Sequence, residues 1–192
     1  MKQLVKPVFL ATTLLIASTA MAADTGWNIG ASVGGSRLNI SNSDCAGITC
    51  DKNDTGFKLY GGYAFAPNVG IEVAYVDLGE ATFSDGTLDG SMSDSGVAAY
   101  GIGTYPINDF SLFAKAGVTS LKTTIKGSIP GLTASDSSTN TNFAWGIGAG
   151  YNFNENVTAI LEWERYKGEF SDLGFHESED VDLFSIEARY NF

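Results

Sequence analysis

Seven charged residues fall on the polar faces of segments in which apolar side chains alternate with small or polar ones: Lys58, Glu72, Lys115, Glu162, Glu164, Glu187 and Arg189. Counted from the short turns between these segments, five of them lie at a similar depth: Glu72, Lys115, Glu162, Glu187 and Arg189. Carboxyl and cationic side chains that meet in an interior form ion pairs, and a pair of carboxyls can act as general acid and base. What the residues do therefore depends on the elements that position them.

Nucleophilic catalysis has one other candidate, the single histidine His176 in "FHESEDVD". Glu177 and Ser178 follow it directly, and adjacent residues of one loop do not converge as nucleophile, base and orienting group. A solvated acidic loop is the simpler interpretation. The sequence therefore predicts no catalytic residue and no cofactor.

The first residues predict export. Lys2 and Lys6 precede an apolar run from Val8 to Ile16, and Ala20-Met21-Ala22 has the small-x-small pattern of a secretory cleavage site. The run is too short to span a bilayer. We therefore expect residues 1–22 to be a signal peptide and 23–192 to be one mature domain.

The mature chain is acidic. Removing the two lysines of residues 1–22 takes the formal net charge from −11 to −13. Because phosphate binding needs clustered lysine and arginine, this charge argues against nucleic acid as a partner.

Two cysteines, Cys45 and Cys50, lie in "DCAGITC". In an exported chain we expect them to form a disulfide that closes a small loop and adds about 2 kcal/mol by the chain-entropy relation. A metal site is the alternative, but two thiols without a nearby histidine leave too few ligands. No metal site is predicted.

Strand-length segments with alternating side chains recur along the rest of the chain. The clearest is 143–153, where Phe143, Trp145 and Ile147 share one face and three glycines share the other. Seven similar segments lie around 27–40, 55–65, 69–83, 95–105, 110–125, 157–170 and 181–192. The pattern predicts eight strands.

The connections between these segments alternate in length. Short turns lie at Ala66–Asn68, Pro106–Asp109 and Asn154–Asn156, whereas the connections near 41–54, 84–94, 126–140 and 171–180 are long and polar. Short turns at one end and long loops at the other are typical of an outer-membrane barrel. The sequence predicts an all-β fold, an eight-stranded antiparallel up-and-down transmembrane β-barrel.

Aromatic residues favour this barrel over a water-soluble barrel or sandwich, because they gather near both ends of the apolar faces, as membrane interfaces require. Near the short turns are Trp27, Tyr63, Phe65, Tyr105, Phe110, Tyr151, Phe153, Tyr190 and Phe192; toward the loops are Phe57, Tyr75, Phe143, Trp145, Trp163 and Phe184. The alternation continues to the last residue, Phe192, as it must if the final strand pairs with the first and leaves no open edge in lipid.

The chain resembles the outer membrane protein A family of small eight-stranded surface-antigen barrels. The likeness rests on "DTGFKLYGGYAFAPNVGIEVAYVDLG" (54–79), "YPINDFSLFAKAGV" (105–118), "ILEWERY" (160–166) and the terminal "YNF". It implies integral outer-membrane localisation in a Gram-negative envelope. It further implies that Tyr190 and Phe192 form an assembly signal read by the outer-membrane insertion machinery.

The resemblance also bears on the lumen. It implies that Glu72 and Glu162 belong to an internal salt-bridge cluster, but Ile102 and Ile160 stand where it implies a lysine and an arginine. Lys115 and Arg189 are therefore expected as bridging cations. The chain ends at Phe192, so we expect no linker and no peptidoglycan-binding domain.

The loops carry acidic residues, Asp85, Asp89 and Asp94 in the second and Asp172, Glu177, Glu179, Asp180 and Asp182 in or beside the fourth. "SDGTLDG" lacks the spacing and terminal glutamate of a calcium loop, so solvated loops are favoured over weak divalent-cation binding. The expected partners are outer-membrane lipids and lipopolysaccharide, with host or surface ligands at the loops.

The prediction is a non-enzymatic barrel that contributes to envelope integrity and presents four extracellular loops for surface interaction or adhesion. An interior of eight strands is just wide enough for side chains to fill, which favours a satisfied polar core. The alternatives are a minor porin-like conductor of ions or small solutes and, by resemblance to other small barrels, a lipid A-modifying enzyme.

Overall fold

The computed structural model describes residues 25–39, 49–84, 89–129, 132–169 and 178–192. Within these ranges the chain forms nine strands: β1 (Gly26–Asn39), β2 (Thr49–Asp51), β3 (Asn53–Ala66), β4 (Val69–Ser84), β5 (Asp89–Ile107), β6 (Phe110–Ile129), β7 (Leu132–Asn152), β8 (Val157–Glu169) and β9 (Ser178–Asn191). Within the described ranges, no helix is long and apolar enough to cross a membrane.

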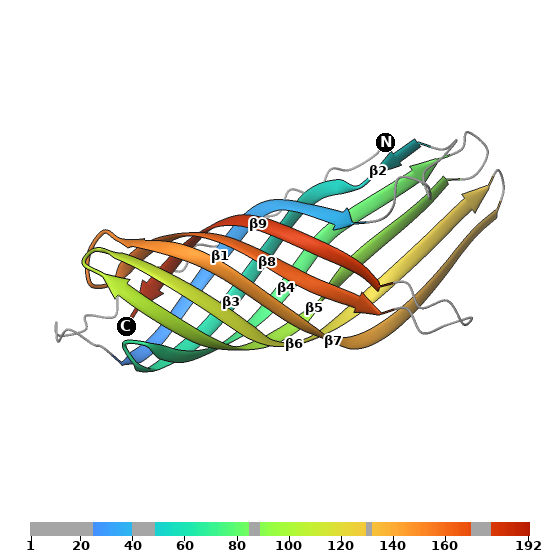
Figure 1. The fold of residues 1–192 in the computed structure, drawn as a ribbon. Coiled ribbons are helices and arrows are strands. Elements are labelled where there is room, and N and C mark those ends of the chain that lie inside the picture. The colour runs from blue at the N-terminus through green and yellow to red at the C-terminus, as the bar shows by residue number, and fades with distance from the viewer. Residues whose placement is uncertain (1–24, 40–48, 85–88, 130–131, 170–177) are drawn as a thin grey trace, which may run out of the picture.

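Eight long strands close into an antiparallel barrel (Figure 1). Each strand pairs with its neighbours in the chain, and the first pairs with the last, from Asn28 opposite Asn191 to Asn39 opposite Asp180. The remaining strand, β2, is short and pairs with the loop end of β4, where Cys50 lies opposite Phe83. The predicted eight-stranded up-and-down barrel is confirmed.

Side chains alternate between the outside and the lumen, as the two-residue period of a strand requires. The outward side chains are apolar and exposed, with the aromatic residues at the ends: Trp27 is 66% exposed and Phe192 is 40% exposed. Neighbouring rings pack in pairs, for example Tyr190 and Phe192 with centroids 5.1 Å apart. An exposed apolar band with aromatic borders is an exterior suited to lipid.

Two strands begin earlier than the sequence pattern predicts. Strand β5 starts at Asp89 rather than near residue 95, and β7 starts at Leu132 rather than near residue 143. The expected loops 84–94 and 126–140 are therefore largely strand, and this expectation was wrong. These extensions lie in water beyond the apolar band, so backbone pairing can hold them without an apolar face, and their serine-rich sequence shows no alternation.

The lumen contains a hydrophobic core in the half nearer the long loops. It is formed by buried inward side chains, of which Val76, Ala144, Tyr166 and Leu183 are 1% exposed or less. Leu38, Leu78, Leu121 and Val181 pack in the same cluster. The sequence pattern predicted only a polar interior there, so this core is a correction to that expectation.

Several predicted features lie outside the described residues. They include the signal peptide (1–22), Cys45 and His176, together with Asp85, Asp172 and Glu177. The Cys45–Cys50 disulfide therefore stays a prediction.

Candidate functional site

A network of ion pairs fills the middle of the lumen, centred on Lys58 of β3. The Nζ of Lys58 lies 2.9 Å from Glu164 Oε2, 3.0 Å from Glu187 Oε1 and 3.9 Å from Glu72 Oε1, and it also pairs with Glu162. The Lys58 side chain is fully buried. An ammonium can be kept charged at such a depth only by several close carboxylates.

Lys115 of β6 is the second cation of the network. Its Nζ lies 2.7 Å from Glu164 Oε1, 2.8 Å from Glu162 Oε1 and 3.1 Å from Glu72 Oε1. Gly146 of β7 is the register partner of both Lys115 and Glu164. Because glycine has no side chain, the lysine can reach across β7 to the glutamate; a Cβ on Gly146 would lie 2.9 Å from Glu164 Cγ.

Strand pairing thus brings together six of the seven predicted charged residues. Lys58 and Glu164, which the count from the short turns did not place at the common depth, are central to the network. Because barrel strands are tilted, residues at different distances from their turns can meet at one level. A count along single strands cannot include that tilt.

Arg189 stands apart from this network. Its Nε donates to the Tyr60 hydroxyl at 3.4 Å, and its guanidinium lies over the rings of Tyr60 and Phe113, at 5.6 and 5.9 Å from their centroids. No ion pair of Arg189 within 4 Å is present among the described residues. The two bridging cations are Lys115, as expected, and Lys58 in place of the expected Arg189.

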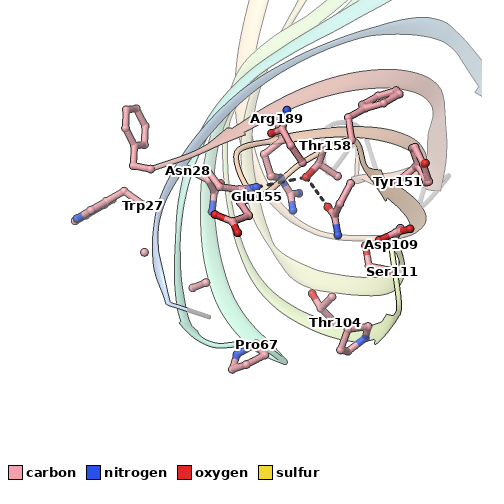
Figure 2. Close-up of a pocket in the computed structure, with 18 of the residues that line it drawn as sticks. Trp27, Asn28, Pro67, Thr104, Asp109, Ser111, Tyr151, Glu155, Thr158 and Arg189 are labelled. Atoms are coloured by element: carbon pink, nitrogen blue, oxygen red, sulfur yellow. Dashed lines mark hydrogen bonds between the residues drawn. The ribbon is translucent and has the colours of Figure 1, made fainter. Parts of the chain in front are cut away.

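Below Arg189 the lumen opens at the short-turn end into a cavity of about 590 Å³, shown in Figure 2. Polar side chains share its lining with apolar ones such as Trp27, Pro67 and Phe153, and two of its hydrogen bonds join Thr158 to Asn152 at 2.7 Å and to Asn191 at 3.4 Å. We call this cavity the vestibule, and Arg189 lies at its inner end. The hydrophobic core adjoins the ion pairs on the side of the long loops.

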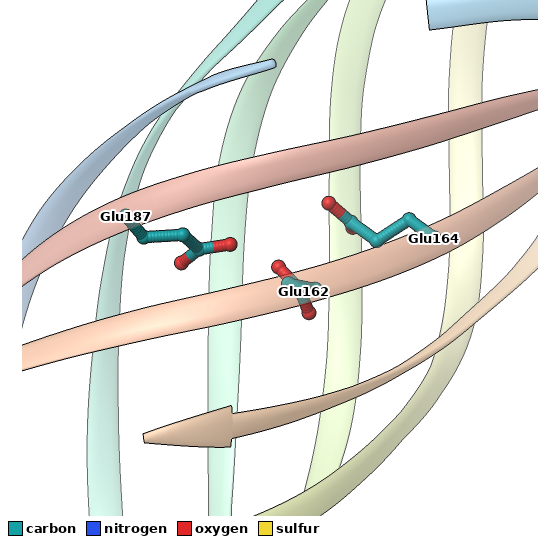
Figure 3. Close-up of side chains that lie close together, drawn as sticks. All are labelled: Glu162, Glu164 and Glu187. Carbon is teal, nitrogen blue, oxygen red and sulfur yellow. The ribbon is translucent and has the colours of Figure 1, made fainter. Parts of the chain in front are cut away.

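The acidic side chains Glu162, Glu164 and Glu187 could be considered as a metal site. Each contributes an oxygen within 4.8 Å of the other two, and Figure 3 shows all three on neighbouring strands β8 and β9. Carboxylate oxygens suit Mg²⁺ or Ca²⁺. Lys58 pairs with all three, however, so a metal ion could bind only by displacing its ammonium. The arrangement is suited to an ion-pair network.

Charged residues beyond the apolar band have different environments. Arg165 donates to both carboxylate oxygens of Asp182, at 2.7 and 2.8 Å, and this hydrogen bonding lowers the pKa of Asp182. Asp94 points into the lumen side and accepts a hydrogen bond from Thr123, but burial raises its pKa. Asp94 was expected in the second long loop but lies in strand β5, whereas Asp182 lies in β9, within the predicted strand 181–192.

The last residue closes the wall at the short-turn end. The backbone N–H of Phe192 donates to the carbonyl of Trp27 at 2.9 Å, which ties the end of the last strand to the start of the first. Tyr190 and Phe192 both point outward among the aromatic residues of this end. This placement is compatible with their predicted use as an assembly signal.

Comparison with known proteins identifies a matching protein family. The family model of the outer membrane protein β-barrel domain matches residues 8–192. Outer membrane protein A of Shigella flexneri is 26% identical over 182 residues, which cover 92% of this chain and 52% of that protein. The chain therefore spans about half the length of the curated relatives it matches.

Solved structures share the fold. The attachment invasion locus protein Ail of Yersinia pestis superposes with a TM-score of 0.58 at 23% identity, over 87% of this chain and 99% of that one. Neisserial surface protein A superposes with a TM-score of 0.59 at 12% identity, over 87% of this chain and 97% of that one. Both likenesses concern the barrel fold.

Proposed function

The chain belongs to the outer membrane protein β-barrel domain family, and from this premise we propose that it is a non-enzymatic barrel that contributes to envelope integrity and presents its long-loop end for surface interaction or adhesion. It is an integral outer-membrane protein, and in such barrels the long loops face the cell exterior.

The observation that carries the proposal is the filled lumen. The network of Lys58, Lys115 and four glutamates is buried, and the hydrophobic core adjoins it, since Val76 is the register partner of Lys58 and Leu183 that of Glu164. Moving ions through this path would require both breaking buried ion pairs and hydrating an apolar segment, each of which is costly. The closed lumen supports a role at the surface rather than in transport.

The shape of the exterior end also supports a surface role. Strands β5, β6 and β7 run past the ends of β8 and β9 (Figure 1). These polar extensions outside the bilayer add little to membrane anchoring, which favours a role for them in binding. Ail, which shares the fold, is described as an attachment invasion locus protein, and it has been crystallised with the heparin analogue sucrose octasulfate.

A conductor of ions is the second candidate. It is favoured by the vestibule and by Arg189, which would form half of a pore if the ion-pair network opened. A lipid A-modifying enzyme is the third, but its candidate base His176 lies outside the described residues. Mass spectrometry of lipid A from overexpressing cells tests that alternative separately.

The decisive experiment shortens the protruding hairpin. Residues 124–137 are removed and Thr123 is joined to Ser138, its register partner, through an Asn-Gly turn. The control Thr124→Ala/Ser137→Ala keeps the hairpin length. Cells that express each form are tested for adhesion to epithelial cells, and the purified barrels are tested for heat-modifiable folding and for conductance in planar bilayers.

We expect the shortened barrel to fold and remain silent in the bilayer while adhesion falls severalfold, with the control unchanged. Unaltered adhesion, together with reproducible channel openings in the wild type, would reject the surface role and promote the conductor.

A further inference from the structure

The wall of the barrel splits at its exterior end between β7 and β8. Their pairing runs from Asn152 opposite Thr158 only as far as Ala144 opposite Tyr166. Strand β7 nevertheless continues outward to Leu132, paired on its other side with β6. Among the described residues, Leu132–Phe143 has no strand partner on the side away from β6; we refer to this side as the β7 edge.

One hydrogen bond shows which backbone groups point to this edge. The N–H of Ser137 donates to the side chain of its neighbour Asp136 at 2.8 Å, rather than to a strand. An antiparallel pair uses the N–H and C=O of every second residue. Ser135, Thr139 and Thr141 therefore have the same orientation as Ser137, and they form a row of donors and acceptors along the β7 edge.

The β7 edge lacks most of the usual features that prevent a further strand from adding to a sheet. Such features are charged side chains, above all lysine, together with proline, a bulge or a very short strand; the charged residue of this stretch is Asp136. Between Leu132 and Phe143 there is no lysine, arginine or proline, and the register with β6 runs without a shift from Ile129 to Phe110. The side chains are mainly serine, threonine and asparagine.

We propose that the β7 edge binds an extended, acidic polypeptide segment of another protein by strand addition. Backbone hydrogen bonds would supply the affinity. On the outer face of the same sheet, Lys122 and Lys126 are the register partners of Thr139 and Ser135, and both are exposed. Acidic side chains of an added strand would be separated from these lysines by β7, whose intervening side chains Thr139 and Ser135 are short.

A second copy of this chain fits the edge poorly. Two barrels in one membrane have the same orientation and are related by rotation about the membrane normal. Because barrel strands tilt by about 35–45°, the two β7 edges would cross at roughly twice that angle and could not form a ladder. The inference rests on the proposed surface function and names the class of partner.

The test uses the full barrel in nanodiscs and a synthetic peptide of alternating threonine and glutamate. We expect the peptide to bind and to slow amide hydrogen exchange at residues 133–141. The same peptide methylated on alternate backbone nitrogens keeps its side chains but loses donors, so it should bind roughly tenfold or more weakly. A threonine–lysine peptide should also bind more weakly.

Variants of Thr139 locate the site. Thr139→Pro removes an edge donor without removing a bond to β6, because proline is tolerated where its nitrogen faces outward from an edge strand. Thr139→Ala keeps the N–H and is the matched control. We expect binding to fall with proline and to persist with alanine.

The proposal is overturned if the threonine–glutamate peptide does not bind or if methylation has no effect. It is also overturned if the edge amides are already protected in the free barrel, since the chain would then cover its own edge. If cell adhesion nevertheless depends on the hairpin, only the strand-addition inference fails and the surface function stands.

Discussion

Lys115 Nζ lies 2.7 Å from Glu164 Oε1 across the glycine of an intervening strand, and both side chains are buried in the lumen. This pair connects β6 to β8 inside the barrel and belongs to a network that has more carboxylates than lysines. Its cations should therefore matter more for stability than any exposed charge.

Replacing Lys115 by methionine should destabilise the barrel. The change keeps the side-chain volume but leaves the nearby carboxylates with one fewer counter-charge, and such a loss costs about 3–5 kcal/mol. Urea unfolding in lipid vesicles measures the free energy. Lys122→Met, at an exposed position, should change it by less than about 0.5 kcal/mol, and an equal effect of both variants would contradict the role of the network.

Adjacent glycines of β1 should respond oppositely to alanine. A Cβ on Gly34 would lie 2.0 Å from the carbonyl oxygen of Phe184, whereas one on Gly35 meets nothing within 4 Å. We expect Gly34→Ala to lower the free energy of unfolding by about 1–3 kcal/mol, because the backbone must shift. Gly35→Ala should be neutral or stabilising, because it restricts the unfolded chain. Folded yield and urea unfolding measure the effect of both variants. Similar losses of stability in the two would contradict the close approach of Gly34 to Phe184.

Two aspartates near the exterior end should give opposite pH dependences. Burial raises the pKa of Asp94, so its charged form opposes folding once pH rises through the folded-state pKa. Asp94→Asn should therefore stabilise the barrel at neutral pH and have little effect below the unfolded pKa of about 3.9, while keeping an acceptor for Thr123. Unfolding at several pH values measures this difference.

Asp182 provides the comparison for that measurement. The hydrogen bonds from Arg165 lower its pKa, so its stabilising contribution is present above the unfolded pKa and is lost as pH falls through the folded pKa. Asp182→Asn should destabilise the barrel at neutral pH and have little effect on its stability in acid. Effects of the same sign for the two variants would show that these environments are misassigned.

Phe192 should matter more for assembly in cells than for stability in lipid. Phe192→Ala and Phe153→Ala each remove one ring of a pair at the short-turn end, with centroids 5.1 Å apart in both pairs. Both should therefore lose similar free energy in vesicles. Only Phe192→Ala should reduce the amount of folded barrel in outer-membrane fractions. An equal loss with Phe153→Ala would contradict the prediction that Phe192 belongs to an assembly signal.

The sequence by itself determined the strand architecture and the outward face. A period of two places Trp27 and Phe192 outside without reference to any partner strand, and alternating turn and loop lengths give the up-and-down order. It also identified the charged residues of the interior, because Glu187 stands in phase with inward positions of its strand. Val181 and Leu183 are in phase with the same inward positions, so the sequence also contained evidence for the inner hydrophobic core, which the prediction of a polar interior did not use.

Only the tertiary structure decided how these residues meet. Register and tilt place Lys58 with Glu187 and leave Arg189 at the vestibule, and neither quantity can be counted along one strand. The extension of β7 to Leu132 was equally hidden, because strands outside lipid are held by backbone hydrogen bonds that any serine or threonine can make. Side-chain patterns record the solvent on each face, whereas pairing depends on the neighbouring strand.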